Sequence, residues 1–199
     1  MGRRKDERTN QIPPRMTSRV PFFLFSVFIL LINSVPSDAT TETIDEVCTL
    51  THSKAHCIAS LESNPDSANA TLNQLGVIAL KLAMENATDT AAYVNSLLHD
   101  SESLEPAVDQ ALRDCDDLYM DAIEQLDDST AAVLNSATKD VTTWIGAAIS
   151  DAESCEDGIK AHGQGKGIAN LSSRNSIFRQ LCNNVLQINR MILGKHTGH

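Results

Sequence analysis

The sequence predicts an all-α protein whose main part is an up-down-up-down four-helix bundle, preceded by a cysteine-bounded segment over residues 44–61. Ala and Leu are common, whereas Gly and Pro are few and aromatic residues make up only 4% of the 199 residues, a composition that favours helices over a β-sandwich or barrel. Four long segments carry apolar residues at alternating spacings of three and four, which is typical of amphipathic helices. The connectors between them are short, so neighbouring helices should run antiparallel.

Residues 1–39 are predicted to be a secretory signal peptide. An apolar run over residues 22–32 is too short for a membrane-spanning helix, which needs about 20 residues. Arg15 and Arg19 precede it, and the small residues Ser37 and Ala39 follow at the −3 and −1 positions of a cleavage site. We therefore expect cleavage near Ala39, a single mature domain over residues 40–199, and a location in the extracellular space.

The charge of the predicted mature chain limits its partners. Residues 40–199 contain 10 Lys and Arg against 23 Asp and Glu, a net charge of −13. A surface this acidic repels nucleic acids and anionic lipid surfaces, so we expect neither as a partner.

The first two bundle helices follow from residue 66 onward. The first is expected to break near residues 86–88, between two parts of one apolar stripe. The stripe consists of Leu72, Leu75, Ala79, Leu82, Val94, Leu97 and Leu98. Pro106 suits the first turn of the second helix, where its missing N–H costs nothing. Asp128 and Ser129 are predicted to form a turn and the N-cap of the third helix.

The third and fourth helices are separated by a glycine-containing break over residues 162–167. The stripe of the third is Leu134, Val141, Ile145, Ala148, Ala152, Cys155 and Ile159. The alternating glycines of the break lack the preceding strand and the Gly-Lys-Ser/Thr of a phosphate loop, which favours a linker. Ser172 or Ser173 is predicted to cap the fourth helix and Gly194 to end it. Its stripe is Ile177, Leu181, Val185, Ile188 and Ile192.

Five cysteines in a secreted protein point to disulfides. Cys48, Cys57, Cys115, Cys155 and Cys182 allow fifteen ways to choose two bridges and one free thiol, and spacing does not decide among them. The sequence has neither the C-x₂₋₄-C pair nor the nearby H-x₃₋₅-H of a zinc site, so we expect no metal. The sequons at Asn69, Asn86 and Asn170 are candidate glycosylation sites.

The residues carry no recognisable catalytic motif, so we expect no enzyme and no cofactor. Cys182 sits in an apolar helix stripe without a neighbouring histidine, which is typical of a buried, inert thiol. Asp117, Asp121 and Glu124 follow one another at i, i+4 and i+7 and therefore share one helix face. By spacing alone, a solvated acidic face explains them best.

The segments around the cysteines resemble the plant invertase and pectin methylesterase inhibitor family. The similarity covers residues 44–194 and lies chiefly in four motifs, at residues 44–65, 111–123, 141–157 and 181–186. It implies a non-enzymatic bundle with an N-terminal hairpin over about 44–64 and the four helices over about 66–194. It also implies bridges Cys48–Cys57 and Cys115–Cys155, with Cys182 free.

The resemblance also implies a target. Members that inhibit invertase typically carry a Pro-Lys-Phe segment between the second and third bundle helices, and residues 136–141 lack it. The pectin methylesterase branch uses an acidic helix face, which aligns with Asp117, Asp121 and Glu124, followed by Ser154 and Asp157 on the next helix. We therefore expect a noncovalent 1:1 complex with pectin methylesterase. An invertase inhibitor, or a structural or signalling bundle of the cell wall, are the alternatives.

Overall fold

The protein is described by a computed structural model, which covers residues 39–100, 104–135 and 137–197. The predicted signal peptide lies outside these residues apart from its last position, Ala39. The described elements are six α-helices and one short 3₁₀ helix, and none of these residues forms a strand. In chain order they are α2 (Ala39–Thr49), α3 (Lys54–Glu62), η1 (Pro65–Asn69), α4 (Leu72–Asp100), α5 (Pro106–Leu134), α6 (Thr138–His162) and α7 (Lys166–Thr197).

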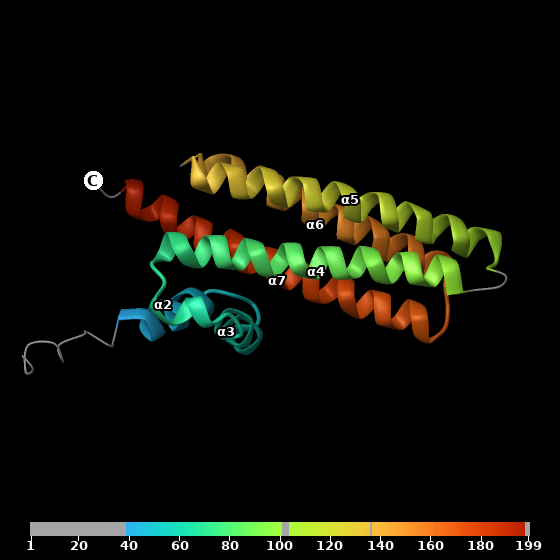
Figure 1. Cartoon of the computed structure of the whole chain (residues 1–199), viewed down its shortest axis with the longest axis horizontal. Coiled ribbons are helices and arrows are strands. Elements are labelled where there is room, and N and C mark those ends of the chain that lie inside the picture. The colour runs from blue at the N-terminus through green and yellow to red at the C-terminus, as the bar shows by residue number, and fades with distance from the viewer. Residues whose placement is uncertain (1–38, 101–103, 136, 198–199) are drawn as a thin grey trace, which may run out of the picture. The chain divides into compact units, whose positions relative to one another are not determined.

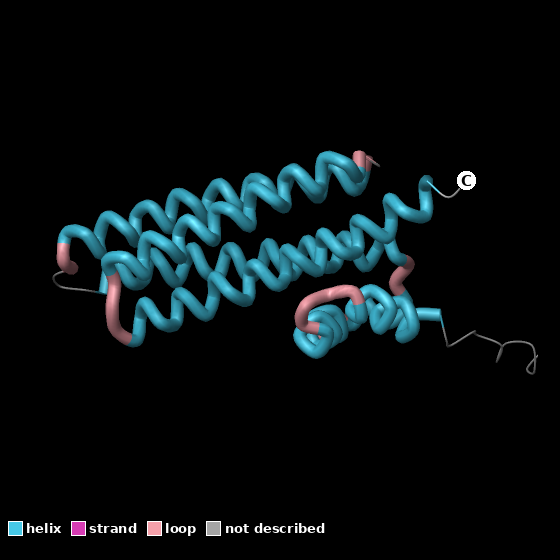
Figure 2. Tube along the Cα trace, turned by 180° about the vertical axis from the view of Figure 1, so that it is seen from behind, coloured by secondary structure: helices cyan, strands magenta, loops and turns pink. Residues whose placement is uncertain are grey.

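The four long helices α4 to α7 form the bundle (Figure 1). α4 packs against α5 and α7, and α6 packs against the same two helices, so the four surround a common core. The chain runs in opposite directions in successive bundle helices, as the view from behind also shows (Figure 2). The predicted all-α, up-down-up-down bundle is confirmed. No helix within the described ranges has the length and apolar character needed to cross a membrane.

A helical hairpin of α2 and α3 precedes the bundle and is closed by a disulfide between Cys48 and Cys57. Val47 and Leu61 are fully buried, both helices pack against α7, and α3 also packs against α4. The hairpin therefore shares the core of the bundle instead of forming a separate unit.

The expected break in the first bundle helix is wrong, because α4 runs uninterrupted from Leu72 to Asp100. The stretch over residues 83–91 keeps the apolar stripe with small side chains, since Ala83, Ala87 and Ala91 are buried. The Thr90 hydroxyl donates a hydrogen bond to the Asn86 carbonyl, 2.7 Å away, which satisfies a polar group inside the helix.

The expected turn at residues 128–129 is also wrong. α5 continues to Leu134, and Ser129 is buried inside the helix with its hydroxyl bonded to the Gln125 carbonyl. Leu134 was assigned to the third apolar stripe, but its side chain is 71% exposed. The fourth helix starts earlier than predicted, at Lys166, and Gly194 lies within it. Gly165 provides the turn before it with a φ of 102°, a conformation that favours glycine.

A buried polar network joins three bundle helices beside the Cys115–Cys155 disulfide. The Tyr119 hydroxyl on α5 donates to Asn175 Oδ1 on α7 at 2.8 Å. Asn175 Nδ2 donates in turn to Glu156 Oε2 on α6 at 2.8 Å, and Lys160 pairs with Glu156 Oε1 at 2.9 Å. Burial alone would raise the pKa of Glu156, but the hydrogen bonds from Lys160, Asn175 and Ser172 outweigh it and lower that pKa. The network fixes α5, α6 and α7 relative to one another.

Glu156→Gln is therefore expected to change how stability depends on pH. A carboxylate with a lowered folded-state pKa contributes stability above its unfolded pKa, near 4.3, and loses it as pH falls through the folded value. The stability advantage of the wild type over Glu156→Gln should thus shrink between about pH 5 and pH 3. Urea unfolding at each pH measures it, with the exposed Glu62→Gln as control. An advantage that stays constant down to pH 3 contradicts the assignment.

The structure joins Cys48 to Cys57 and Cys115 to Cys155, and leaves Cys182 as a buried free thiol. These are the pairs that the family resemblance implies. Peptide mapping of the purified protein without reduction should recover both linked peptide pairs and an alkylatable Cys182 after unfolding. A peptide that links Cys182 to another cysteine of the chain would refute this pairing.

Candidate functional site: an acidic face on α5 and α6

The carboxylates singled out by their spacing lie together on the outside of the bundle. Asp117, Asp121 and Glu124 are all exposed on α5, and α6, the neighbour of α5, carries the exposed Ser154 and Asp157. Met120 on α5 and Trp144 on α6 are exposed as well. We call this surface the α5–α6 face, defined by Asp117, Met120, Asp121, Glu124, Trp144, Ser154 and Asp157.

The carboxylates of the α5–α6 face have no basic partner among the residues that the structure describes. Two nearby acidic residues do have basic partners: Asp109 pairs with Arg113 at 2.9 Å, and Glu153 pairs with Arg179 at 3.4 Å. The bond and charge of Asp109 also raise the pKa of Arg113, so that guanidinium is already engaged. The face is therefore left with unneutralised negative charge that is free to meet donors on another molecule.

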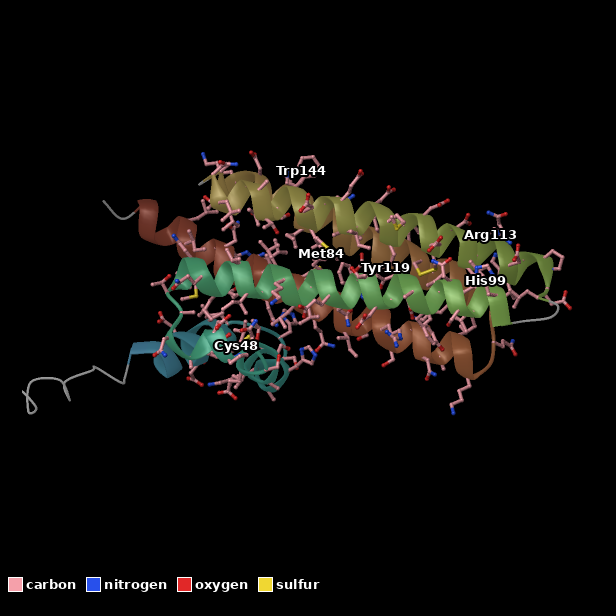
Figure 3. All side chains as sticks on the ribbon, in the orientation of Figure 1. Cys48, Met84, His99, Arg113, Tyr119 and Trp144 are labelled. Carbon is pink, nitrogen blue, oxygen red and sulfur yellow. A yellow bond between two sulfur atoms is a disulfide. The ribbon has the colours of Figure 1, made fainter. Side chains whose placement is uncertain are left out.

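Two large apolar side chains accompany this charge. The Met120 side chain is 57% exposed and that of Trp144 is 38% exposed. Figure 3 shows Trp144 at the outer edge of the α5–α6 pair. Partly buried aromatic residues are common anchors of protein interfaces. An acidic surface that also exposes large apolar side chains is more typical of a binding surface for another protein than of a helix face that only contacts water.

The Cys115–Cys155 bridge, with a Cα–Cα distance of 4.7 Å, fixes which residues of the two helices lie level. α5 and α6 are antiparallel, so the residues after each cysteine run in opposite directions from the bridge. Ser154 is consequently level with Asp117, whereas Asp157 lies on the other side of the bridge. Ser154 keeps its hydroxyl bonded to the Ser150 carbonyl at 2.9 Å, which leaves its oxygen able to accept another bond.

Sequence reasoning missed Asp151, which lies in the seam between the two helices. It is half-buried, one turn before Ser154, and its neighbours on α5 are Asp121 and Gln125. Burial raises the pKa of Asp151, a hydrogen bond with Gln125 lowers it, and the charge of Asp121 raises it again, with a net rise. The sequence shows that Asp151 lies one helical turn before Ser154. Its position between α5 and α6, however, depends on the register of the two helices.

A surface pocket of about 280 Å³ opens beside one end of the α5–α6 face. It lies between the end of α4 and the start of α5, and Asp117 forms part of its wall together with Asn95, Leu98, His99, Arg113 and Asp116. Asn95 Nδ2 donates to Asp116 Oδ1 at 2.7 Å, which ties α4 to α5 at this point. The pocket gives the face a hollow next to an otherwise convex helix pair.

The other singled-out residues lie away from this face. Cys182 is fully buried in α7, and burial raises the pKa of its thiol, as expected of an inert cysteine. Asn69 and Asn170 are exposed, whereas Asn86 is half-buried within α4 and its Oδ1 has no hydrogen-bond partner in the described part of the chain. Among the described residues, no group of three or more His, Cys, Asp or Glu side chains could hold a metal ion.

Comparisons with known proteins agree with this architecture. The sequence model of the family "Plant invertase/pectin methylesterase inhibitor" matches residues 42–188. A "Pectinesterase inhibitor" of Actinidia deliciosa is 27% identical over 88% of this chain and 93% of its own length. A protein of Platanus acerifolia named "Putative invertase inhibitor" is 27% identical over 85% of this chain and 94% of its own length.

A solved structure shows the same fold. A mutant form of a pectin methylesterase inhibitor from Arabidopsis superimposes with a TM-score of 0.66 at 23% identity, covering 74% of this chain and 95% of that one. With the family model matching most of the chain, the helical bundle, its hairpin and its sequence motifs all have one explanation: this chain belongs to the plant invertase/pectin methylesterase inhibitor family.

Proposed function

We propose that this protein is a secreted inhibitor of pectin methylesterase. It binds the esterase noncovalently in a 1:1 complex through the α5–α6 face and covers the cleft that binds pectin, thereby modulating pectin de-esterification in the cell wall. The observation that carries the proposal is the set of exposed carboxylates without basic partners on α5 and α6, two helices that also expose Met120 and Trp144. Membership in the inhibitor family supports the class of activity.

The contact is expected to combine two kinds of interaction. Met120 and Trp144 supply apolar area that is removed from water, and the surrounding carboxylates accept hydrogen bonds from the rim of the partner. Exposed charges mainly accelerate association and select the partner, so inhibition should weaken as ionic strength rises.

The main alternative is inhibition of a cell-wall or vacuolar invertase. It is favoured by relatives that are named invertase inhibitors. Against it stands the connection between α5 and α6, which runs from Asn135 to Ala137 and contains no Pro-Lys-Phe segment. A bundle with a structural or signalling role in the cell wall, and no enzyme target, is the second alternative.

We also propose that the protein has no catalytic activity of its own. The one free cysteine among the described residues is buried, and no histidine is positioned as its base. Neither nucleic acid nor a membrane is proposed as a partner, because the mature chain is strongly acidic.

Titration of the purified mature protein against a pectin methylesterase and against an invertase separates these functions. The proposal predicts stoichiometric loss of esterase activity at one inhibitor per enzyme and unchanged invertase activity. Inhibition of invertase alone would establish the first alternative, and inhibition of neither enzyme would favour the second.

A further inference from the structure

The three sequons of the chain lie in different structural settings. Asn69 is exposed and ends the short helix η1, and Ala70 after it is extended, with a φ of −78° and a ψ of 136°. Asn170 is exposed but lies within α7, and Asn86 is half-buried in the middle of α4. A sugar attached to asparagine is bulky and polar and is typical of surface loops, so Asn69 has the most suitable setting of the three.

Asn86 is poorly placed to carry a sugar. Its Oδ1 is buried and lacks a hydrogen-bond partner within the described residues. Nδ2, the atom to which a sugar would be attached, belongs to the same amide group. The residues one turn before and one turn after it on the helix, Ala83 and Thr90, are buried. A sugar on Asn86 would have to emerge past a packed part of α4, so we expect this sequon to stay unmodified.

A groove of about 530 Å³ opens beside Asn69, between η1 and the first turns of α4. Its volume lies within the range of about 300–1,000 Å³ that is usual for small-molecule sites. We call it the η1–α4 groove, and its lining includes Pro65, Asp66, Asn69, Gln74, Val77 and Ile78. Because Asn69 itself forms part of the wall, a sugar attached to its Nδ2 begins at the groove.

The groove offers both kinds of contact that a sugar ring makes. Val77 and Ile78 are apolar and can pack against the C–H groups of the ring. Gln74 is held by Thr71, whose backbone N–H and hydroxyl donate to Gln74 Oε1 at 2.8 and 2.9 Å. This leaves Gln74 Nε2 as a donor and the exposed Asp66 carboxylate as an acceptor for sugar hydroxyls. A few polar groups around an apolar surface are typical of a small-ligand site.

We propose that Asn69 carries an N-linked glycan whose first N-acetylglucosamine residues lie in the η1–α4 groove, whereas Asn86 remains unmodified. In the modification, Asn69 Nδ2 attacks the anomeric carbon of an oligosaccharide held on a lipid diphosphate. The new C–N bond replaces the C–O bond to the diphosphate, and the amide loses one proton as the lipid diphosphate leaves. In the folded protein, the sugar contacts both η1 and α4 and so stabilises the start of the bundle. This glycan requires entry into the secretory pathway and so rests on that part of the proposed function, but it does not depend on which enzyme is inhibited.

Mass spectrometry of glycopeptides tests which residue is modified. The full chain is expressed in plant cells and purified from the medium, and the peptides that contain Asn69 and Asn86 are compared. The Asn69 peptide should carry a glycan in most molecules, and the Asn86 peptide in almost none. A secreted chain with an unmodified Asn69, or with a glycan on Asn86, would overturn the assignment alone. A chain retained in the cells with residues 1–39 still attached would refute secretion and the glycan together.

Urea unfolding tests the position of the sugar in the groove. Wild type and Asn69→Gln are each made in plant cells and in the bacterial periplasm, which allows disulfides to form but adds no such sugar. For the plant-made proteins, the folding equilibrium constant of the wild type should exceed that of Asn69→Gln by roughly two- to tenfold, the net contribution of about one hydrogen bond. For the periplasmic proteins, the two constants should be equal.

The matched control is Asn170→Gln, which removes an exposed sequon outside the groove. Its folding equilibrium constant should equal that of the wild type from either source. A plant-made Asn69→Gln as stable as the wild type would overturn the contact between sugar and groove. An equal loss of stability in plant-made Asn170→Gln would also overturn it, because any surface sugar would then have the same effect.

Discussion

Asn175→Ala is expected to lower the free energy of unfolding by about 3–5 kcal/mol, a large share of the stability of a small domain. Asn175 holds two groups at once, accepting from the Tyr119 hydroxyl and donating to Glu156. Its loss leaves a buried hydroxyl unpaired and removes one of the bonds that keep the Glu156 carboxylate ionised. The Tyr119 hydroxyl then loses the partner that offsets its burial, and Glu156 keeps only part of its support, chiefly the ion pair with Lys160.

Asn183→Ala is the matched control, because Asn183 lies on the same helix with an exposed side chain. Its substitution should change stability by no more than about 0.5 kcal/mol. Urea unfolding followed by far-UV circular dichroism at neutral pH compares the two. Equal denaturation midpoints would show that the network does not stabilise the bundle.

Removal of the Cys115–Cys155 bridge should be the next largest perturbation. In the chain-entropy treatment, a bridge that closes a loop of roughly 40 residues contributes about 3.9 kcal/mol, and one closing roughly 10 residues about 2.7 kcal/mol. The sequence separations here are 40 for Cys115–Cys155 and 9 for Cys48–Cys57.

The comparison therefore needs two double variants, Cys115→Ala with Cys155→Ala and Cys48→Ala with Cys57→Ala. Alanine at both positions avoids new free thiols. Thermal and urea unfolding should rank the first variant below the second, and both below the wild type. The reverse order would mean that loop length does not determine which of the two bridges stabilises the protein more.

The helical architecture could be predicted from the sequence because the signal is strong and repeated. The stripes of α6 and α7 recur over several turns, and Val141, Ile145, Val185 and Ile188 are buried as their spacing indicates. Element ends were less predictable. Ser129 resembles an N-cap residue in the sequence, but tertiary packing buries it and its hydroxyl bonds back to the Gln125 carbonyl, so α5 continues.

The candidate site was predictable in part, for a related physical reason. Helical spacing places Asp117, Asp121 and Glu124 on one face whatever surrounds them. The positions of Asp151 and Gln125 in the seam depend instead on how α5 meets α6, which a single helix does not encode. The exposure of Trp144 likewise depends on how α6 packs against its neighbours, which its position in the sequence does not reveal.

In the proposed complex, the carboxylates of the α5–α6 face contact pectin methylesterase. Neutralising three of them with Asp117→Asn, Asp121→Asn and Glu124→Gln should remove about 0.5–1 kcal/mol each, which is roughly a ten- to hundredfold weaker inhibition. The matched control neutralises three exposed acids elsewhere, with Glu46→Gln, Glu62→Gln and Asp89→Asn. Both variants change the net charge by the same amount.

The most direct measurement is the inhibition constant of these two variants and the wild type against one pectin methylesterase at fixed pH and ionic strength. We expect much weaker inhibition by the variant of the α5–α6 face and nearly wild-type inhibition by the control, with both proteins folded by circular dichroism. Equal inhibition constants for the two variants would contradict it, because only the total charge of the inhibitor would then matter.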